Sequence, residues 1–141
     1  MTIEKIEDEI IEQIKIGIPT LKTVDTFEAD YDLMEIKKFL FMTPFVLVHY
    51  AARMPVQTLA DGSAAIEKCE FDFYVGSKSL RNKREAQAGD YTILDALRNL
   101  FSGARMTIDG EMLKPFEYLG EQFVSSLEGI VVYKISFSLY L

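Results

Sequence analysis

The sequence has little cysteine, little histidine and no long apolar run, and each shortage excludes a class of protein. A single cysteine, Cys69, among 141 residues excludes an intramolecular disulfide and a cysteine-rich zinc site. No run of roughly 18 apolar residues is present for a transmembrane helix. The acidic start, residues 1 to 9, lacks the basic and then apolar character of a signal peptide. We therefore expect a cytosolic chain that is neither exported by that route nor membrane-spanning.

Catalytic motifs are also missing. His49 is the single histidine, so a Ser-His-Asp triad, a Cys-His pair or a zinc centre has to be built around it. Because it lies in an apolar run, we expect it to pack at a sheet edge or to hydrogen-bond in the core, with a general base or a ligand as the alternative. Cys69 has the same parity as apolar neighbours, which favours a buried small hydrophobe over a nucleophile. The eight glycines form no phosphate-binding loop.

Acidic residues are abundant but do not form a recognisable site. Asp and Glu number 22 against 15 Lys and Arg, and the net charge of −7 argues against a general nucleic-acid binder or a polybasic membrane-surface protein. One set of acidic residues lies on the side of the first helix that we expect to face solvent. A later set is spaced too loosely to form a calcium-binding loop or a pair of catalytic carboxyl groups. The first group is Glu4, Asp8, Glu9 and Glu12, and the second is Asp109, Glu111, Glu117 and Glu121.

The chain begins with the pattern of an amphipathic helix. Isoleucines recur at three- and four-residue spacings from Ile3 to Ile14, which predicts a helix over about residues 3 to 16. We expect Thr2 to cap it and Gly17 to end it.

A strand, a second helix and a central strand are predicted next. Residues 21 to 27 are rich in β-branched side chains and favour a strand. Apolar spacing over residues 33 to 40 predicts a short helix that ends before Thr43. Residues 45 to 52 are apolar at both parities, as in a central strand covered on both faces.

A hairpin follows. Asp61 and Gly62 form a turn signal, so residues 45 to 56 and 64 to 75 are predicted to pair. In the second arm an apolar face alternates with a wet face. The apolar face is Cys69, Phe71, Phe73 and Val75, and the wet face is Lys68, Glu70 and Asp72.

The second half of the chain predicts a charged loop, a helix and strands. Residues 77 to 89 contain no aromatic or β-branched side chain and are interpreted as a loop. Asp90 is then expected to cap a helix that ends at Gly103. Its buried stripe is Leu94, Leu97, Leu100 and Phe101. From Met106 the pattern returns to strands, the last of which runs over residues 130 to 141.

These elements predict one α+β domain over residues 1 to 141, a mostly antiparallel mixed sheet with about three helices packed on it. The final strand has two possible places. It is either paired inside the sheet, which we favour, or left as an edge that joins like subunits by sheet extension.

The strongest local charge lies in residues 77 to 89. Four basic side chains oppose Glu85 alone, which gives a local charge of +3 in a chain of −7: Lys78, Arg81, Lys83 and Arg84. This segment is either a solvated loop or a recognition arm for an acidic protein surface or for phosphates. Without aromatics in the segment, any nucleic-acid contact would be to backbone phosphates and strongly salt-dependent.

Three stretches together resemble a known family. They are Phe45-Val-Leu-Val-His-Tyr-Ala-Ala52, then Phe73-Tyr-Val-Gly76 before the basic segment, and a spaced pattern from Gly89 through Tyr91, Leu94, Leu97, Arg98 and Phe101 to Gly103. In this layout the chain is similar to the small tail proteins of Mu-like phages and prophages, which resemble tail terminators or tail completion proteins.

The resemblance implies a structural protein without catalysis or cofactor. Such a subunit assembles as a ring, with six copies expected, at the head-proximal end of a phage tail, stops growth of the tube and sheath, and allows head joining. Its expected partners are its own copies, tube and possibly sheath proteins and a head-completion protein, with no membrane. No sequence-specific nucleic acid is expected, although DNA phosphates would pass near the ring lumen.

The expected location follows from the same resemblance, as do the candidate residues. The protein would be part of a virion tail or tail-like particle assembled in the cytoplasm of a bacterial host. The basic residues at positions 78, 81, 83 and 84 are the candidate ring-contact or lumen-facing positions. The alternatives are a minor tail or head–tail adaptor component and, in a different class, a small ligand-binding or enzymatic domain centred on His49.

Overall fold

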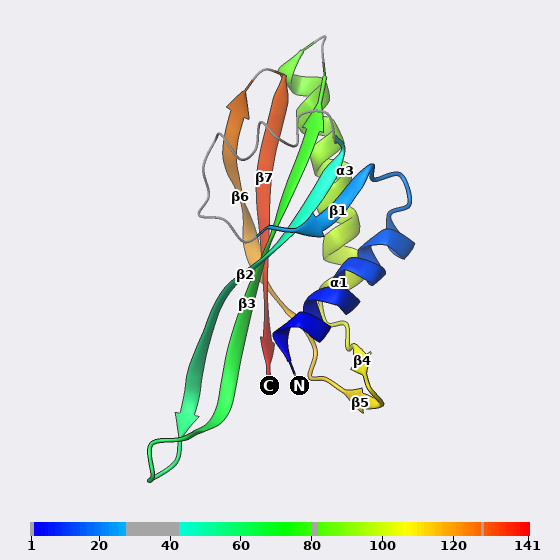
Figure 1. Cartoon of the computed structure of the whole chain (residues 1–141). Coiled ribbons are helices and arrows are strands. Elements are labelled where there is room, and N and C mark those ends of the chain that lie inside the picture. The colour runs from blue at the N-terminus through cyan, green and yellow to red at the C-terminus, as the bar shows by residue number, and fades with distance from the viewer. Residues whose placement is uncertain (1, 28–42, 80–81, 128) are drawn as a thin grey trace.

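The computed structural model of the chain describes residues 2–27, 43–79, 82–127 and 129–141 (Figure 1). A five-stranded mixed sheet has the strand order β1-β2-β3-β7-β6, and a small two-stranded sheet lies apart from it. The described residues contain two helices, α1 (Ile3–Gly17) and α3 (Lys83–Phe101), which pack on the sheet around one main core. The predicted α+β fold class is confirmed. The helix predicted over residues 33 to 40 lies outside the described residues.

Helix α1 (Ile3–Gly17) forms as its isoleucine spacing predicts. Ile6, Ile10 and Ile14 are fully buried, and the Thr2 side chain caps the helix by accepting a hydrogen bond from the amide of Lys5 at 3.4 Å. Apolar side chains three and four residues apart lie on one face, and this face enters the core. Both the helix and its cap are confirmed.

The sheet is built around one long hairpin. Strand β1 (Thr23–Thr26), shorter than the predicted 21 to 27, pairs in parallel with the start of β2 (Phe45–Thr58). β2 then pairs antiparallel with β3 (Ala64–Lys78), which confirms the predicted hairpin. The coverage of β2 on both faces holds only for residues 45–48, where all four side chains are buried, and not as far as residue 52.

The final strand lies inside the sheet. β7 (Ile130–Tyr140) pairs antiparallel with β3 on one side and with β6 (Glu117–Leu127) on the other. The interpretation of this strand as an exposed edge is therefore wrong. β6 pairs with the backbone N–H and C=O groups on the second side of β7, as the favoured alternative predicted.

The centre of the core is a cluster of aromatic rings. Phe73 of β3 lies 5.3 Å from the ring of Phe101 on α3 and 5.4 Å from that of Phe137 on β7, measured between ring centroids. Phe116 also meets Phe101, at 5.6 Å in an edge-on arrangement. All four side chains are buried. Such edge-on and tilted pairs fix how α3 sits on the sheet.

Helix α3 begins earlier than the sequence pattern predicts. It spans Lys83–Phe101, so residues 83 to 89 are helical rather than a loop. Asn82 is the N-cap, and its side chain accepts a hydrogen bond from the amide of Glu85 at 2.8 Å. Asp90 is therefore not a cap but a buried residue within the helix. The prediction failed because a lack of β-branched and aromatic residues also suits a helix rich in Lys, Arg, Glu, Gln and Ala.

A small hairpin lies between α3 and β6 in the chain. It consists of β4 (Thr107–Ile108) and β5 (Glu111–Met112), and an ion pair between Lys5 and Asp109 connects it to α1. Neither described helix is long and apolar enough to cross a bilayer.

Candidate interaction surface

The described basic candidates gather at one end of the molecule. Lys78 is the last residue of β3, and Lys83 and Arg84 form the first turn of α3, where the two elements meet (Figure 1). All three side chains are exposed. Arg81 lies outside the described residues. The described basic residues thus lie together at one end of the molecule, where the sequence had predicted a long loop.

Two side-chain hydrogen bonds fix the start of α3, which carries Lys83 and Arg84. Besides the Asn82 cap, the hydroxyl of Ser79 donates a hydrogen bond to the carboxylate of Glu85 at 2.7 Å. Lys83 and Arg84 lie at the positive end of the helix dipole, where cations are unfavourable by roughly 0.3–1 kcal/mol. Their placement there does not help the helix to form.

Aromatic side chains from two other elements meet this end. The ammonium group of Lys83 lies 5.6 Å from the ring centroid of Phe123 on β6, within cation–π range. Phe123 is half exposed, and its ring lies 5.7 Å from that of Tyr133 on β7. Tyr91 of α3 is also half exposed, and its ring lies 5.5 Å from that of Tyr133.

We call Lys83, Arg84, Tyr91, Phe123 and Tyr133 the basic–aromatic surface. Lys83, Arg84 and Tyr91, with Gln87 and Ala88, line a shallow hollow on α3. Positions 84, 87, 88 and 91 fall on one face of the helix, because they follow the three- and four-residue spacing. This spacing was visible in the sequence, but the loop assignment for residues 77 to 89 concealed it. Phe123 carried no such local signal.

Two titratable groups beneath this surface have raised pKa values. The Tyr91 hydroxyl lies 3.1 Å from that of Tyr133, and this hydrogen bond, with burial, raises the pKa of Tyr133 to about 12. Burial raises the pKa of Asp90 to about 8, and the neighbouring Ser77 offsets only part of the rise. Neither carboxylate oxygen of Asp90 has a partner in hydrogen-bonding geometry among the described residues. The exposed charged residues at the start of α3 are Lys83, Arg84 and Glu85.

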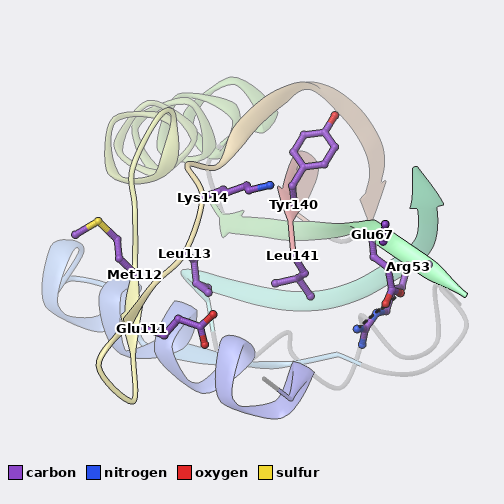
Figure 2. Close-up of a pocket in the computed structure, with 10 residues that line it drawn as sticks. Arg53, Glu67, Glu111, Met112, Leu113, Lys114, Tyr140 and Leu141 are labelled. Atoms are coloured by element: carbon purple, nitrogen blue, oxygen red, sulfur yellow. Dashed lines mark hydrogen bonds and ion pairs between the residues drawn. The ribbon is translucent and has the colours of Figure 1, made fainter. Parts of the chain in front are cut away.

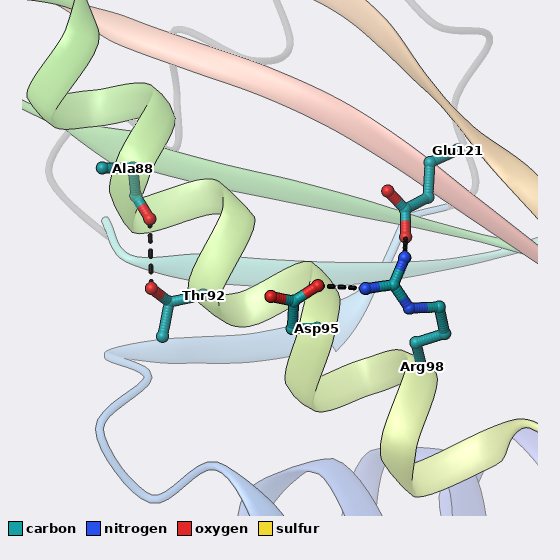
Figure 3. Close-up of polar contacts among 5 residues, drawn as sticks. All are labelled: Ala88, Thr92, Asp95, Arg98 and Glu121. Carbon is teal, nitrogen blue, oxygen red and sulfur yellow. Dashed lines mark hydrogen bonds and ion pairs between the residues drawn. The ribbon is translucent and has the colours of Figure 1, made fainter.

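Further along α3, an arginine ties the helix to β6. Arg98 forms ion pairs with Asp95 on its own helix and with Glu121 of β6, the second at 3.1 Å (Figure 3). Its guanidinium also lies 6.0 Å from the ring centroid of Tyr118. Earlier on the same helix, the Thr92 hydroxyl donates a hydrogen bond to the Ala88 carbonyl at 3.1 Å (Figure 3). Exposed pairs of this kind contribute little stability but orient the two elements.

His49 is hydrogen-bonded within the fold, as expected. Its Nδ1 lies 2.7 Å from the carbonyl oxygen of Phe27, and since a carbonyl only accepts, Nδ1 carries the proton. The imidazole is half-buried beside the rings of Phe27 and Tyr74. Cys69 is fully buried, and burial raises the pKa of its thiol. No group of three or more His, Cys, Asp or Glu side chains in the described part of the chain is arranged to hold a metal ion.

A second exposed feature is the far end of the β2–β3 hairpin. We call residues 54–66 the hairpin arm, which projects beyond the rest of the sheet (Figure 1). Residues 54–65 are all exposed, with large apolar side chains at Met54, Val56 and Leu59. The sequence predicted the hairpin but not that its outer part leaves the body of the protein.

The comparisons with known proteins bear on the fold alone. No family model and no curated protein matches the sequence. Among 32 matching chains of known structure is one with a TM-score of 0.56, 17% sequence identity, and coverage of 99% of this chain and 94% of the other. The name of that protein describes no activity or partner. At this identity the likeness shows a shared fold alone, and it covers nearly the whole of both chains.

Proposed function

We propose that this protein is a structural subunit of a phage tail or a related tail-like particle, and that it acts as a tail terminator. Copies form a ring, with six expected, at the head-proximal end of the tail, where they stop tube and sheath growth and allow head joining. The protein then belongs to the virion tail and is assembled in the cytoplasm of a bacterial host. It performs no catalysis and needs no cofactor.

One observation carries this proposal beyond the sequence resemblance: the exposed basic–aromatic surface. Partly exposed aromatics with neighbouring cations are the side chains that protein interfaces favour. The cations occupy one end of a chain whose net charge is −7, so a neighbouring copy or an acidic tube surface offers the opposite charge. Repetition around a ring multiplies each weak contact.

Deletion of the gene tests the terminator role directly. We expect tails longer than normal and without heads, because nothing would stop tube growth. Electron microscopy of the lysate measures the tail lengths. Tails of normal length in the deletion strain would overturn the terminator role and favour the minor tail or head–tail adaptor alternative.

A charge reversal tests whether the basic–aromatic surface takes part. Lys83→Glu is expected to prevent rings from forming on tail tubes, because it removes the cation–π contact and reverses the charge at this position. Arg105→Glu, at an exposed loop position, is the matched control and is expected to leave the rings intact. Equal effects of the two variants, or none, would remove this surface from the proposal.

Among the described residues, no observation favours the class centred on His49. Its Nδ1 proton is already donated to a backbone carbonyl, and its ring lies beside two aromatic side chains that contact each other. These contacts are those of a positioned core-edge histidine.

A further inference from the structure

Asp90 combines an ionisable side chain with complete burial. Charged side chains elsewhere in the described chain are exposed or only partly buried, and several are paired. In the groove between the β4–β5 hairpin and the end of β7, for example, Arg53 forms an ion pair with Glu67 (Figure 2). Asp90 is 0% exposed, and neither carboxylate oxygen has a hydrogen-bond partner among the residues that the structure describes. Because a buried charge costs far more than a buried neutral group, this position favours the protonated carboxyl group.

The first two turns of α3 have little else to hold them on the sheet. Among residues 83 to 90 only Ala86 and Asp90 are buried, whereas the later turns bury four large apolar side chains. The free energy gained by burial scales with apolar area, so a single methyl group contributes little. Attachment of this segment to β3 therefore depends on the protonation state of Asp90.

The backbone of α3 lies directly against β3 at this position. A Cβ added at Gly89 would lie 2.9 Å from the hydroxyl oxygen of Ser77 and 3.1 Å from its Cβ, and Ser77 is itself buried. The two elements therefore have to separate before water can hydrate an ionised Asp90. A hollow of about 390 Å³, lined in part by Ser77, Gly89 and Thr92, borders this contact and gives water a route once the contact opens.

The groups that face Asp90 from β3 and β7 are hydroxyls. Burial raises the pKa of Asp90 to about 8, and Ser77 of β3 offsets only part of the rise. On β7, the pKa of Tyr133 is raised to about 12 by its hydrogen bond with Tyr91 and by burial, with a smaller contribution from Asp90. Lys78 and Lys134 belong to the opposite face of these strands, because side chains alternate along a strand.

The other charged groups around α3 are exposed or already paired. Residues 83 to 85, in the first turn, are exposed. On β6, Glu121 forms an ion pair with Arg98, further along the helix. Helix α1 meets α3 beside Leu100, near the far end of α3. The causes of the raised pKa of Asp90 accordingly include no charged side chain of the described chain.

We propose that the protonated form of Asp90 holds the first two turns of α3 against β3, and that loss of its proton releases these turns. Lys83 and Arg84 lie in the first turn and Tyr91 directly follows Asp90, so the basic–aromatic surface loosens with them. The surface is thus firm at acidic pH and opens more readily as the pH rises. This inference rests on the proposed function for its biological role, since the same surface is proposed to join the subunits.

Amide exchange at single residues, measured from about pH 5 to pH 7.5, tests the switch, with exchange times scaled to the intrinsic rate at each pH. The opened segment exposes Asp90, which then releases its proton at its ordinary pKa. We expect the opening equilibrium constant of residues 86–90 to rise roughly tenfold per pH unit. It should also exceed the constant of residues 94–101 at every pH, because the later turns open only when the whole core unfolds. Equal constants in the two segments, or no pH dependence at residues 86–90, would overturn the switch.

Three variants sharpen this test, and thermal melting checks their folds. Asp90→Asn should abolish the pH dependence at residues 86–90, because an amide does not titrate. Asp95→Asn, on the same helix and 64% exposed, is the matched control and should keep the parent slope. Ser77→Ala keeps the test open if Asp90→Asn does not fold. Since Ser77 lowers the pKa of Asp90, its loss should move the pH at which the rise levels off, about 8 in the parent, to a higher value. A folded Ser77→Ala protein that levels off at the parent pH or below it would overturn the assignment to Asp90.

The outcomes separate this inference from the proposed function, because amide exchange uses the isolated chain. Over-long tails in the deletion strain together with pH-independent exchange at residues 86–90 would overturn the switch and leave the terminator role standing. The expected pH dependence together with normal tail length would support the switch and overturn the terminator role.

Discussion

The two halves of the β2–β3 hairpin differ although they belong to the same pair of strands. In the inner half, residues 45–48 pair with residues 73–76, and all eight residues are buried. In the outer half, residues 54–65 are exposed throughout. Both halves are paired strands, so backbone pairing does not explain the difference in burial. The halves differ in whether their side chains contact α1, α3 and the neighbouring strands.

This difference separates folding from interaction. The inner half contributes Phe73 and Val75 to the main core, where burial of apolar surface stabilises the fold. The outer half has no core residue to contribute, so substitutions there should leave the free energy of unfolding of the isolated chain nearly unchanged. Its large apolar side chains, Met54, Val56 and Leu59, stay exposed.

Truncation of a core ring should give the largest effect. Phe73→Ala removes the ring that contacts both Phe101 and Phe137 and is expected to lower the free energy of unfolding by about 3–5 kcal/mol. Val56→Ala in the hairpin arm should lower it by less than ~0.5 kcal/mol, because Val56 is 54% exposed. Urea denaturation measures both. A comparable loss in the two variants would contradict the division of the hairpin.

The next effect concerns a carboxyl group packed against the inner half. Asp90 on α3 is fully buried beside Ser77 of β3, and its pKa is raised from 3.8 to about 8. The folded state therefore binds the proton more tightly than the unfolded state. This contribution to stability is fully present below pH ~4 and is lost as the pH rises toward about 8, at about 1.4 kcal/mol per pH unit.

Asp90→Asn removes this titration. The variant should lose the downward slope between pH 5 and pH 8 (roughly the window between the two pKa values) and become more stable relative to the parent as the pH rises. Asp95→Asn is the control, because that side chain is 64% exposed, and it should retain the parent slope. Urea denaturation at several pH values measures the slopes. An Asp90→Asn protein with the parent slope would show that Asp90 is not the group responsible.

Local patterns in the sequence predicted most of the fold. The isoleucine spacing located α1, and the parity of Cys69, Phe71, Phe73 and Val75 located the buried face of β3. These patterns succeed because the spacing of apolar residues within one helix or strand depends on which of its sides faces the core. The start of α3 was missed because charged and alanine-rich residues are compatible with both a loop and a helix, and the Asn82 cap was overlooked.

The candidate surfaces were less predictable because they join residues far apart in the sequence. Lys83 was identified from local charge, but Phe123 reaches it only through the pairing of β6 with β7. The basic segment itself contains no aromatic residue, as noted from the sequence, but the fold brings the ring of Phe123 to Lys83 from another strand. In the same way, a hairpin pattern gives no sign of where the body of the protein ends and the arm begins.

A methyl group added to the inner half should give a smaller effect. A Cβ at Gly76 would lie 2.2 Å from the ring of Phe45, its partner on β2. Gly76→Ala is therefore expected to lower the free energy of unfolding by about 1–3 kcal/mol, because the buried ring has to move. Phe45→Leu in the same chain should recover part of this loss. Thermal and urea denaturation measure it, and equal losses with and without Phe45→Leu would contradict the steric cause.

The corresponding change in the outer half should give the smallest effect, and for a different reason. A Cβ at Gly62 would have no atom within 4 Å, but the backbone φ of +89° is one that side chains rarely adopt. Gly62→Ala is expected to lower the free energy of unfolding by about 1 kcal/mol or less through this turn alone. Gly62→Asn should lower it less, because Asn tolerates positive φ better than Ala.

Amide exchange separates the two halves: Gly62→Ala should speed exchange in the arm and leave residues 45–48 protected, since the inner half is stabilised by the core. Faster exchange in both halves would show that the arm and the body unfold as one unit.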